Sequence, residues 1–158
     1  MIRSSLVALL LPLAACGSPN GSSGPCAVGD RAAELATSAA ASCGSFDESI
    51  PGACFELYGD GGCPDGGLPG GLACALDAQA ARSPFTLSVT EHGVDTSTTL
   101  VFVRTPAGRS YELSQGYSAN FGGQTFEVDE ASCASFAPDG GFDGLTCVSA
   151  GPLTTLCH

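Results

Sequence analysis

Phe85-Thr86-Leu87-Ser88-Val89-Thr90 sets the fold class of this chain. Its apolar and hydroxyl side chains alternate, and a period of two is typical of a β-strand that buries one face. Thr98–Arg104 is rich in β-branched residues, and Ser110–Ser114 follows it after the turn Pro106-Ala107-Gly108, so these segments predict a hairpin. Further short strands are predicted at Phe55–Tyr58, Gln124–Val128, Leu145–Val148 and Leu153–Cys157.

Two Ala-rich segments in the first half of the chain predict helices. Asp30–Ser42 has apolar residues at helical spacing, with Asp30 as its expected N-cap and Cys43 as the residue that would join its end to the domain. Ala73–Ala81 predicts a second short helix that ends before Pro84. The expected fold is a small, disulfide-rich α+β domain, in which one or two short helices pack on an antiparallel β-meander of about four to six strands.

The charge of the chain excludes one class of partner. Sixteen Asp and Glu residues outnumber five Lys and Arg residues, and the net charge at pH 7 is −11. Such a chain repels the phosphates of nucleic acid, so nucleic-acid binding is not expected. It also repels anionic lipid headgroups, so membrane attachment would need a covalent lipid rather than a basic patch.

The N-terminal residues predict export. Arg3 precedes an apolar run from Leu6 to Leu13, which is too short to span a bilayer as a helix, and small residues then lead into a cysteine in Leu13-Ala14-Ala15-Cys16. This pattern resembles the lipobox of bacterial lipoproteins, in which Cys16 would carry the lipid and begin the mature chain. Gly17, rather than Asp, follows that cysteine, which by the same resemblance implies the outer membrane. The alternatives are an ordinary cleaved signal peptide, with Cys16 as an incidental thiol, and a buried N-terminal helix.

The chain divides accordingly into three parts. Residues 1–15 are the expected signal peptide, and residues 16–25, which are rich in Gly, Ser and Pro, are the expected flexible tether. Residues 26–158 are long enough for a single disulfide-crosslinked domain with a modest core.

Cysteine usage supports the same compartment. Without Cys16, the nine cysteines of the chain leave an even set, which in an exported protein predicts a disulfide framework. The disulfide candidates are Cys26, Cys43, Cys54, Cys63, Cys74, Cys133, Cys147 and Cys157. The sequence leaves their pairing open. The absence of any C-x-x-C argues against a zinc site and against thioredoxin-like redox chemistry.

A second resemblance covers the middle of the chain. The segments Cys74-Ala75-Leu76, Phe85-Thr86-Leu87 and His92-Gly93-Val94-Asp95, together with Cys133, resemble uncharacterised, cysteine-rich predicted lipoproteins of high-GC Gram-negative bacteria. This resemblance implies a single exported domain and carries over no activity.

No set of residues in the sequence predicts catalysis. The chain has two histidines and lacks the motifs G-x-S-x-G, S-x-x-K and H-E-x-x-H, which would supply a nucleophile, a base or a metal site. His92, which lies between Glu91 and Gly93, is interpreted as a surface turn residue. The rival hypothesis is a hydrolase in which Glu127 or Asp129 acts as the base with His92 nearby.

The sequence also contains residues that could bind a ligand. Asp-Gly clusters could supply oxygen ligands to calcium, although such pairs are also common in turns. The candidate calcium ligands are Asp60, Asp65, Asp139 and Asp143. Aromatic side chains could stack on a glycan. The candidates for this role are Tyr58, Tyr111, Tyr117 and Phe121.

These observations predict a non-enzymatic lipoprotein that needs no cofactor and is attached to the membrane through the lipid on Cys16. It would act as a binding or structural module of the cell envelope, and its partner would be an envelope protein or a glycan. The alternative is a calcium- or glycan-binding module that uses the Asp-Gly loops.

Overall fold

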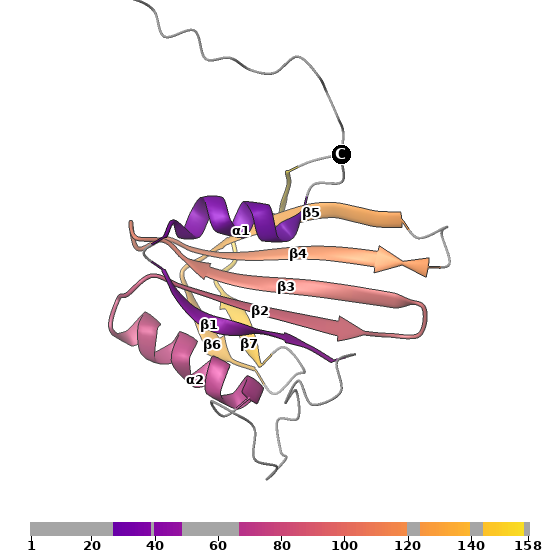
Figure 1. Cartoon of the computed structure of the whole chain (residues 1–158). Helices are drawn as coiled ribbons and strands as arrows, with labels where there is room; N and C mark the ends of the chain where they lie inside the picture. The colour runs from indigo at the N-terminus through magenta and orange to yellow at the C-terminus, as the bar shows by residue number, and fades with distance from the viewer. Residues whose placement is uncertain (1–26, 39, 49–66, 120–123, 140–143, 157–158) are drawn as a thin grey trace, which may run out of the picture.

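The computed structural model describes residues 27–38, 40–48, 67–119, 124–139 and 144–156. They form a small α+β domain with the helices α1 (Val28–Ala36) and α2 (Gly67–Ala80) (Figure 1). The strands are β1 (Ala41–Asp47), β2 (Phe85–His92), β3 (Thr96–Arg104), β4 (Ser110–Ser118), β5 (Gln124–Cys133), β6 (Ser135–Pro138), β7 (Leu145–Val148) and β8 (Thr154–Thr155). Neither described helix is long and apolar enough to cross a membrane.

The main sheet is mixed rather than purely antiparallel. Its strand order is β1-β2-β3-β4-β5-β8, and β6 and β7 form a separate two-stranded sheet. Neighbours from β2 to β8 pair antiparallel, whereas β1 pairs parallel with β2. The parallel pair arises because the chain passes through α2 between these strands, and parallel neighbours need such a crossover. The predicted meander is therefore not confirmed as the whole architecture.

The two faces of the sheet are covered by different elements (Figure 1). On one face, α1 packs on the buried residues Val101, Val103, Leu113 and Val128. On the other face, α2 and the β6–β7 hairpin enclose a second core, which includes three apolar residues of β2 and Phe102 of β3. The alternation along β2 produces this arrangement, because it points Phe85, Leu87 and Val89 toward α2 and the intervening hydroxyl residues toward the opposite face.

Polar and covalent contacts fix the elements of the α2 layer. The side-chain amide of Gln79 on α2 donates to the carbonyl oxygen of Phe136 at 2.9 Å and accepts from its backbone N–H at 2.7 Å, so it pairs with β6 as a strand neighbour would. One disulfide joins Cys43 of β1 to Cys74 of α2, and another joins Cys133 of β5 to Cys147 of β7. Hydrogen bonds or disulfides therefore join α2 to β6, β1 to α2, and β5 to β7, in addition to apolar packing.

The helix predicted over Asp30–Ser42 is wrong in its second half. α1 ends at Ala36, the next residue Thr37 has a φ of 57°, and the chain then enters β1. Asp30 lies in the first turn, and the N-cap is Ala27, which makes no side-chain capping hydrogen bond. Cys43 consequently lies within a strand rather than at a helix end.

Other boundaries differ by smaller amounts. α2 begins at Gly67, before the predicted start at Ala73, since Pro69 is tolerated in a first helical turn. The strands β4 and β5 are longer than predicted, and β6 was not predicted. The predicted strand Phe55–Tyr58 lies outside the described residues.

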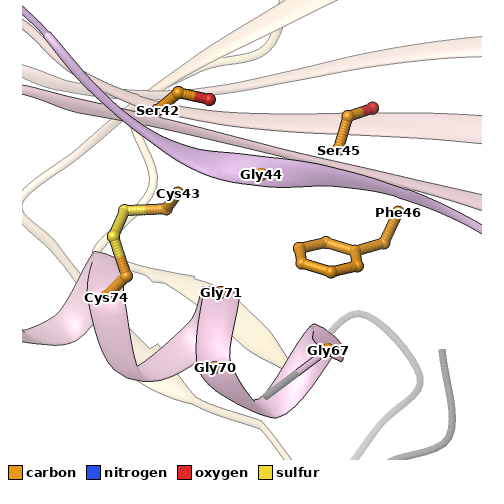
Figure 2. A pocket seen from close by; sticks show the side chains of 9 residues that line it. All are labelled: Ser42, Cys43, Gly44, Ser45, Phe46, Gly67, Gly70, Gly71 and Cys74. Atoms are coloured by element: carbon orange, nitrogen blue, oxygen red, sulfur yellow. A yellow bond between two sulfur atoms is a disulfide. The ribbon is translucent and has the colours of Figure 1, made fainter. Parts of the chain in front are cut away.

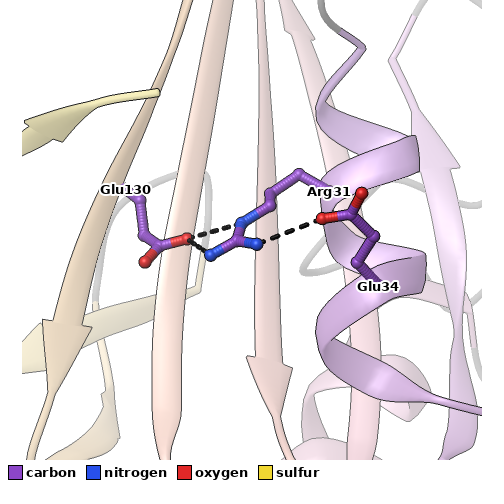
Figure 3. A network of polar contacts seen from close by, with 3 residues as sticks. All are labelled: Arg31, Glu34 and Glu130. Atoms are coloured by element: carbon purple, nitrogen blue, oxygen red, sulfur yellow. Dashed lines mark hydrogen bonds and ion pairs between the residues drawn. The ribbon is translucent and has the colours of Figure 1, made fainter. Parts of the chain in front are cut away.

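An ion-pair network attaches α1 to the sheet (Figure 3). Arg31 of α1 donates from Nε to Oε2 of Glu130 on β5 at 2.8 Å, and its Nη2 lies 2.8 Å from the same oxygen. Its Nη1 donates to Glu34 at 3.1 Å. The hydrogen bond to Glu130 is the main reason that the pKa of Arg31 is raised above its ordinary value, although burial opposes this. These ion pairs thus hold the helix to β5 in addition to its apolar packing on Val128 of that strand.

Replacing Arg31 by methionine is expected to lower the free energy of unfolding by about 1–2 kcal/mol, because the half-buried Glu130 carboxylate would lose charged donors. Urea unfolding followed by circular dichroism measures the change. The matched control is Glu34→Gln, which breaks only the exposed i,i+3 pair and should cost less than about 0.5 kcal/mol. Equal losses in the two variants would contradict this assignment.

Candidate functional site

His92 ends β2 and contacts the end of the neighbouring edge strand β1. Its Nε2 lies 2.9 Å from Oδ1 of Asp47, and its backbone N–H donates to Oε2 of Glu48 at 2.9 Å. The parallel register places Asp47 beside Thr90, which is two residues before His92 and on the same face of the sheet. The contact becomes an ion pair when the imidazole is protonated. Both side chains are about one-third exposed, so the pair is accessible.

Cross-strand neighbours extend this pair into a polar surface. His92 lies opposite Ser97 on β3, and Ser97 lies opposite Tyr117 on β4. The adjacent row contains Thr90 and Thr99, whose hydroxyl oxygens are 3.0 Å apart. We call this surface the polar face. Its residues are Asp47, Thr90, His92, Ser97, Thr99, Gln115 and Tyr117.

The polar face is the part of the α1 side of the sheet that α1 does not cover. Helix α1 begins at the edge of the polar face, where the backbone N–H of Val28 donates to Oε1 of Gln115 at 3.1 Å. The strands continue beyond that end of the helix (Figure 1). Tyr117 is accordingly 41% exposed, whereas Leu113, on the same strand but beneath α1, is fully buried.

A hollow of about 310 Å³ lies at the β2–β3 turn, where the polar face ends. It is lined by Glu48, Glu91, His92, Gly93, Thr96, Ser97 and Thr98. Glu91 and Thr98 alternate with His92 and Ser97 along their strands, so they lie on the α2 side of the sheet. The hydrogen bond from Gly93 N–H to the carbonyl oxygen of Thr96 makes His92 and Ser97 a pair without mutual ladder hydrogen bonds, in which side chains approach most closely. Imidazole, carboxylate and hydroxyl groups therefore meet at one end of the sheet.

This end of the sheet is acidic. Asp47, Glu48, Glu91 and Asp95 lie there, at the ends of β1 and β2 and in the β2–β3 turn. Among the described arginines, Arg31 pairs with carboxylates beside α1, and the others lie near the start of β2, which is about 23 Å from its end. Those others are Arg82, Arg104 and Arg109. Acidic side chains thus outnumber basic ones at this end of the sheet, where His92 is the basic side chain among the described residues.

Comparisons with protein-family models, with curated proteins and with solved structures found no match to this chain.

A second hollow, of about 420 Å³, lies between β1 and α2 (Figure 2). Close packing surrounds it, because a Cβ atom at Gly71 would lie 2.5 Å from the Phe46 ring and 2.8 Å from the carbonyl oxygen of Cys43. Gly44, which has a φ of 110°, also packs against this ring. The residues that line the hollow include a disulfide, serines and glycines but no ionisable side chain, so it offers little chemistry.

The structure separates the residues of the hydrolase hypothesis. Glu127 and Asp129 lie on β5, and two strands stand between β5 and the β2 strand that carries His92, a distance of about 14 Å across the sheet. Asp129 accepts a hydrogen bond from the hydroxyl of Thr155 at 2.7 Å. These carboxylates and the imidazole do not form one site.

Three of the four calcium candidates, Asp60, Asp65 and Asp143, lie outside the described residues. Asp139 is described, and its backbone N–H donates to the carbonyl oxygen of Gly144 at 3.0 Å. Within the described ranges, one group brings three potential metal ligands together: Glu112, Cys133 and Cys147. Its two sulfur atoms form a disulfide and are not available as thiolates.

Of the remaining candidates, Tyr111 is half-buried on β4, and Tyr117 belongs to the polar face. The other aromatic candidates, Tyr58 and Phe121, lie outside the described residues. Cys16, Cys26, Cys54, Cys63 and Cys157 also lie outside the described residues.

The contact between Asp47 and His92 was not predicted from the sequence. The signal that was present is the hydroxyl-rich face of β2, which ends at His92.

Proposed function

We propose that the protein is a lipid-anchored, non-enzymatic domain of the bacterial cell envelope that acts as a binding or structural module. The observation that carries this proposal is the sequence Leu13-Ala14-Ala15-Cys16 ahead of a domain held by disulfides. Disulfides persist in exported proteins and are rare in the cytosol, so the joined pairs of the domain support export. The lipobox resemblance supports attachment through Cys16, followed by a tether over residues 16–25.

Replacing Cys16 by serine is expected to abolish membrane association, because the acyl chains would have no attachment site. The full chain is expressed in a Gram-negative host and partitioned between detergent and aqueous phases, and its intact mass is measured. The unchanged chain should enter the detergent phase with a mass that begins at Cys16 and includes acyl groups. The serine variant should remain aqueous.

Gly17→Asp is the matched control for this experiment. It keeps Cys16 and should remain in the detergent phase, but it should move from the outer to the inner membrane in a density gradient. A Cys16→Ser variant that still partitions with the detergent would refute the lipid anchor.

The polar face favours a glycan as the partner. An exposed tyrosine lies beside hydroxyl, carboxylate and imidazole groups, which is the chemistry that recognises sugar hydroxyls and the apolar side of a sugar ring. Titration of the purified full chain with soluble oligosaccharides, followed by NMR or calorimetry, tests this role.

A further inference from the structure

We infer that the polar face binds an oligosaccharide that carries protonated amino groups, that is, a chain of unacetylated amino sugars. This inference rests on the glycan-binding role proposed above and names the class of sugar. It follows from three properties of the surface, namely its hydrogen-bonding groups, its exposed aromatic ring and its charge.

The hydrogen-bonding groups suit a polyol. Thr90, Ser97 and Thr99 present hydroxyls that both donate and accept, and the imidazole of His92 and the carboxylate of Asp47 extend the same face. Sugar hydroxyls are likewise both donors and acceptors, and they need such mixed partners. Because these side chains stand on paired strands, their spacing is set by the sheet rather than by a loop.

Tyr117 supplies an aromatic surface at one side of this array. It lies directly opposite Ser97 and is 41% exposed, although its ring is large and apolar. An amphipathic ring of this kind can cover the C–H face of a sugar while its hydroxyl stays in water. From Asp47 on β1 to Tyr117 on β4 the face crosses three strand spacings, roughly 14 Å, so it can contact more than one sugar ring.

The charge of the surface selects among sugars. The carboxylates of Asp47 and Glu48 lie on or beside the polar face, where His92 is the basic side chain and contacts Asp47, and the described arginines lie elsewhere. A protonated amino group is attracted to these carboxylates and can donate to their oxygens. A polymer of sugar acids would be repelled by the same groups and by the net charge of −11.

The test is calorimetric titration of the full chain in detergent with glucosamine oligomers, at a pH where the amines are protonated. The matched probes are N-acetylglucosamine oligomers of equal length, the polyamine spermine, and oligogalacturonate. We expect the glucosamine oligomer to bind at least tenfold more tightly than any of the other probes. Its affinity should fall as the salt concentration rises, because the contacts involve charges.

Four variants locate the site. Tyr117→Ala should weaken binding at least tenfold, whereas Tyr117→Phe, which keeps the ring, should bind within about threefold of the unchanged chain. Asp47→Asn removes charge but keeps shape, so it should weaken binding and reduce the salt dependence. Leu153→Ala changes an exposed apolar residue outside the polar face and should leave binding unchanged. Thermal melting of each variant verifies that it is folded.

Several outcomes overturn the inference. Equal binding of the acetylated oligomer would remove the role of charge, and equal binding of spermine would show that the surface recognises cations without regard to sugar. Absence of binding by a folded chain would reject the site. None of these outcomes affects the partitioning of Cys16→Ser, so failure here and failure of the lipid anchor are distinguishable.

Discussion

Replacing Phe102 by alanine lowers the free energy of unfolding by about 3–5 kcal/mol, if the α2-side core has the role that its packing indicates. Phe102 is fully buried at the centre of the sheet, and its ring meets that of Phe136 edge-on with centroids 5.4 Å apart. Phe136 meets Phe85 in the same way at 5.9 Å. Truncation at Phe102 would therefore leave a cavity between the sheet and the β6–β7 hairpin, and neighbouring rings would lose their contacts.

Chemical denaturation with guanidinium, with disulfides intact, measures this loss. Small domains are stable by only about 5–15 kcal/mol, so the variant should unfold at a much lower denaturant concentration. Leu153→Ala is the control, since Leu153 is 66% exposed and its truncation should change the stability by less than about 0.5 kcal/mol. A loss below about 1 kcal/mol for Phe102→Ala would contradict the packing described.

Removing the Cys43–Cys74 disulfide is the second large effect. The double variant Cys43→Ala, Cys74→Ala should lose about 3–4 kcal/mol, because the bond closes a loop between residues 31 positions apart and so restricts the unfolded chain. The bond also holds the edge strand β1 against α2, which β1 contacts through few large apolar residues.

The Cys133–Cys147 bond provides the comparison. Its residues are 14 positions apart, so the double variant Cys133→Ala, Cys147→Ala should lose less, about 3 kcal/mol. Urea unfolding of both double variants under non-reducing conditions measures the two losses. If removing the shorter loop costs clearly more, or if removing the longer one costs nothing, the loop-closure explanation is wrong.

The central strands could be predicted because their sequences alternate between residues that face the core and residues that face away from it. β2 alternates between a buried apolar face and a hydroxyl face, and Pro106-Ala107-Gly108 turns the chain between β3 and β4. The same patterns give strand identity but not strand length. β4 and β5 extend beyond the predicted ends because their last residues find ladder partners on each other.

β1 could not be predicted from local sequence. Ala41–Asp47 consists mainly of small and polar residues that favour neither strands nor a core, and it follows an Ala-rich helix without a clear stop. Its extended conformation depends on pairing with β2, which lies more than forty residues later in the chain. A bulge between Ser42 and Ser45 further obscures any alternation.

The candidate site was inaccessible to sequence reasoning for the same reason. His92 and Asp47 are 45 positions apart, and their contact follows from the register of a parallel pair that the sequence did not reveal. Tyr117 could be named as a possible glycan contact, but its place beside Ser97 and His92 required the β3–β4 register.

The two described disulfides also change what a protease can do to this protein. Cys43–Cys74 and Cys133–Cys147 each close part of the backbone into a covalent ring. A single cut anywhere between the two cysteines of a ring opens the backbone without releasing a fragment. A nicked protein would therefore migrate as one molecule on a non-reducing gel and as two pieces after reduction. The domain can therefore be cut once within either ring and remain a single covalent body.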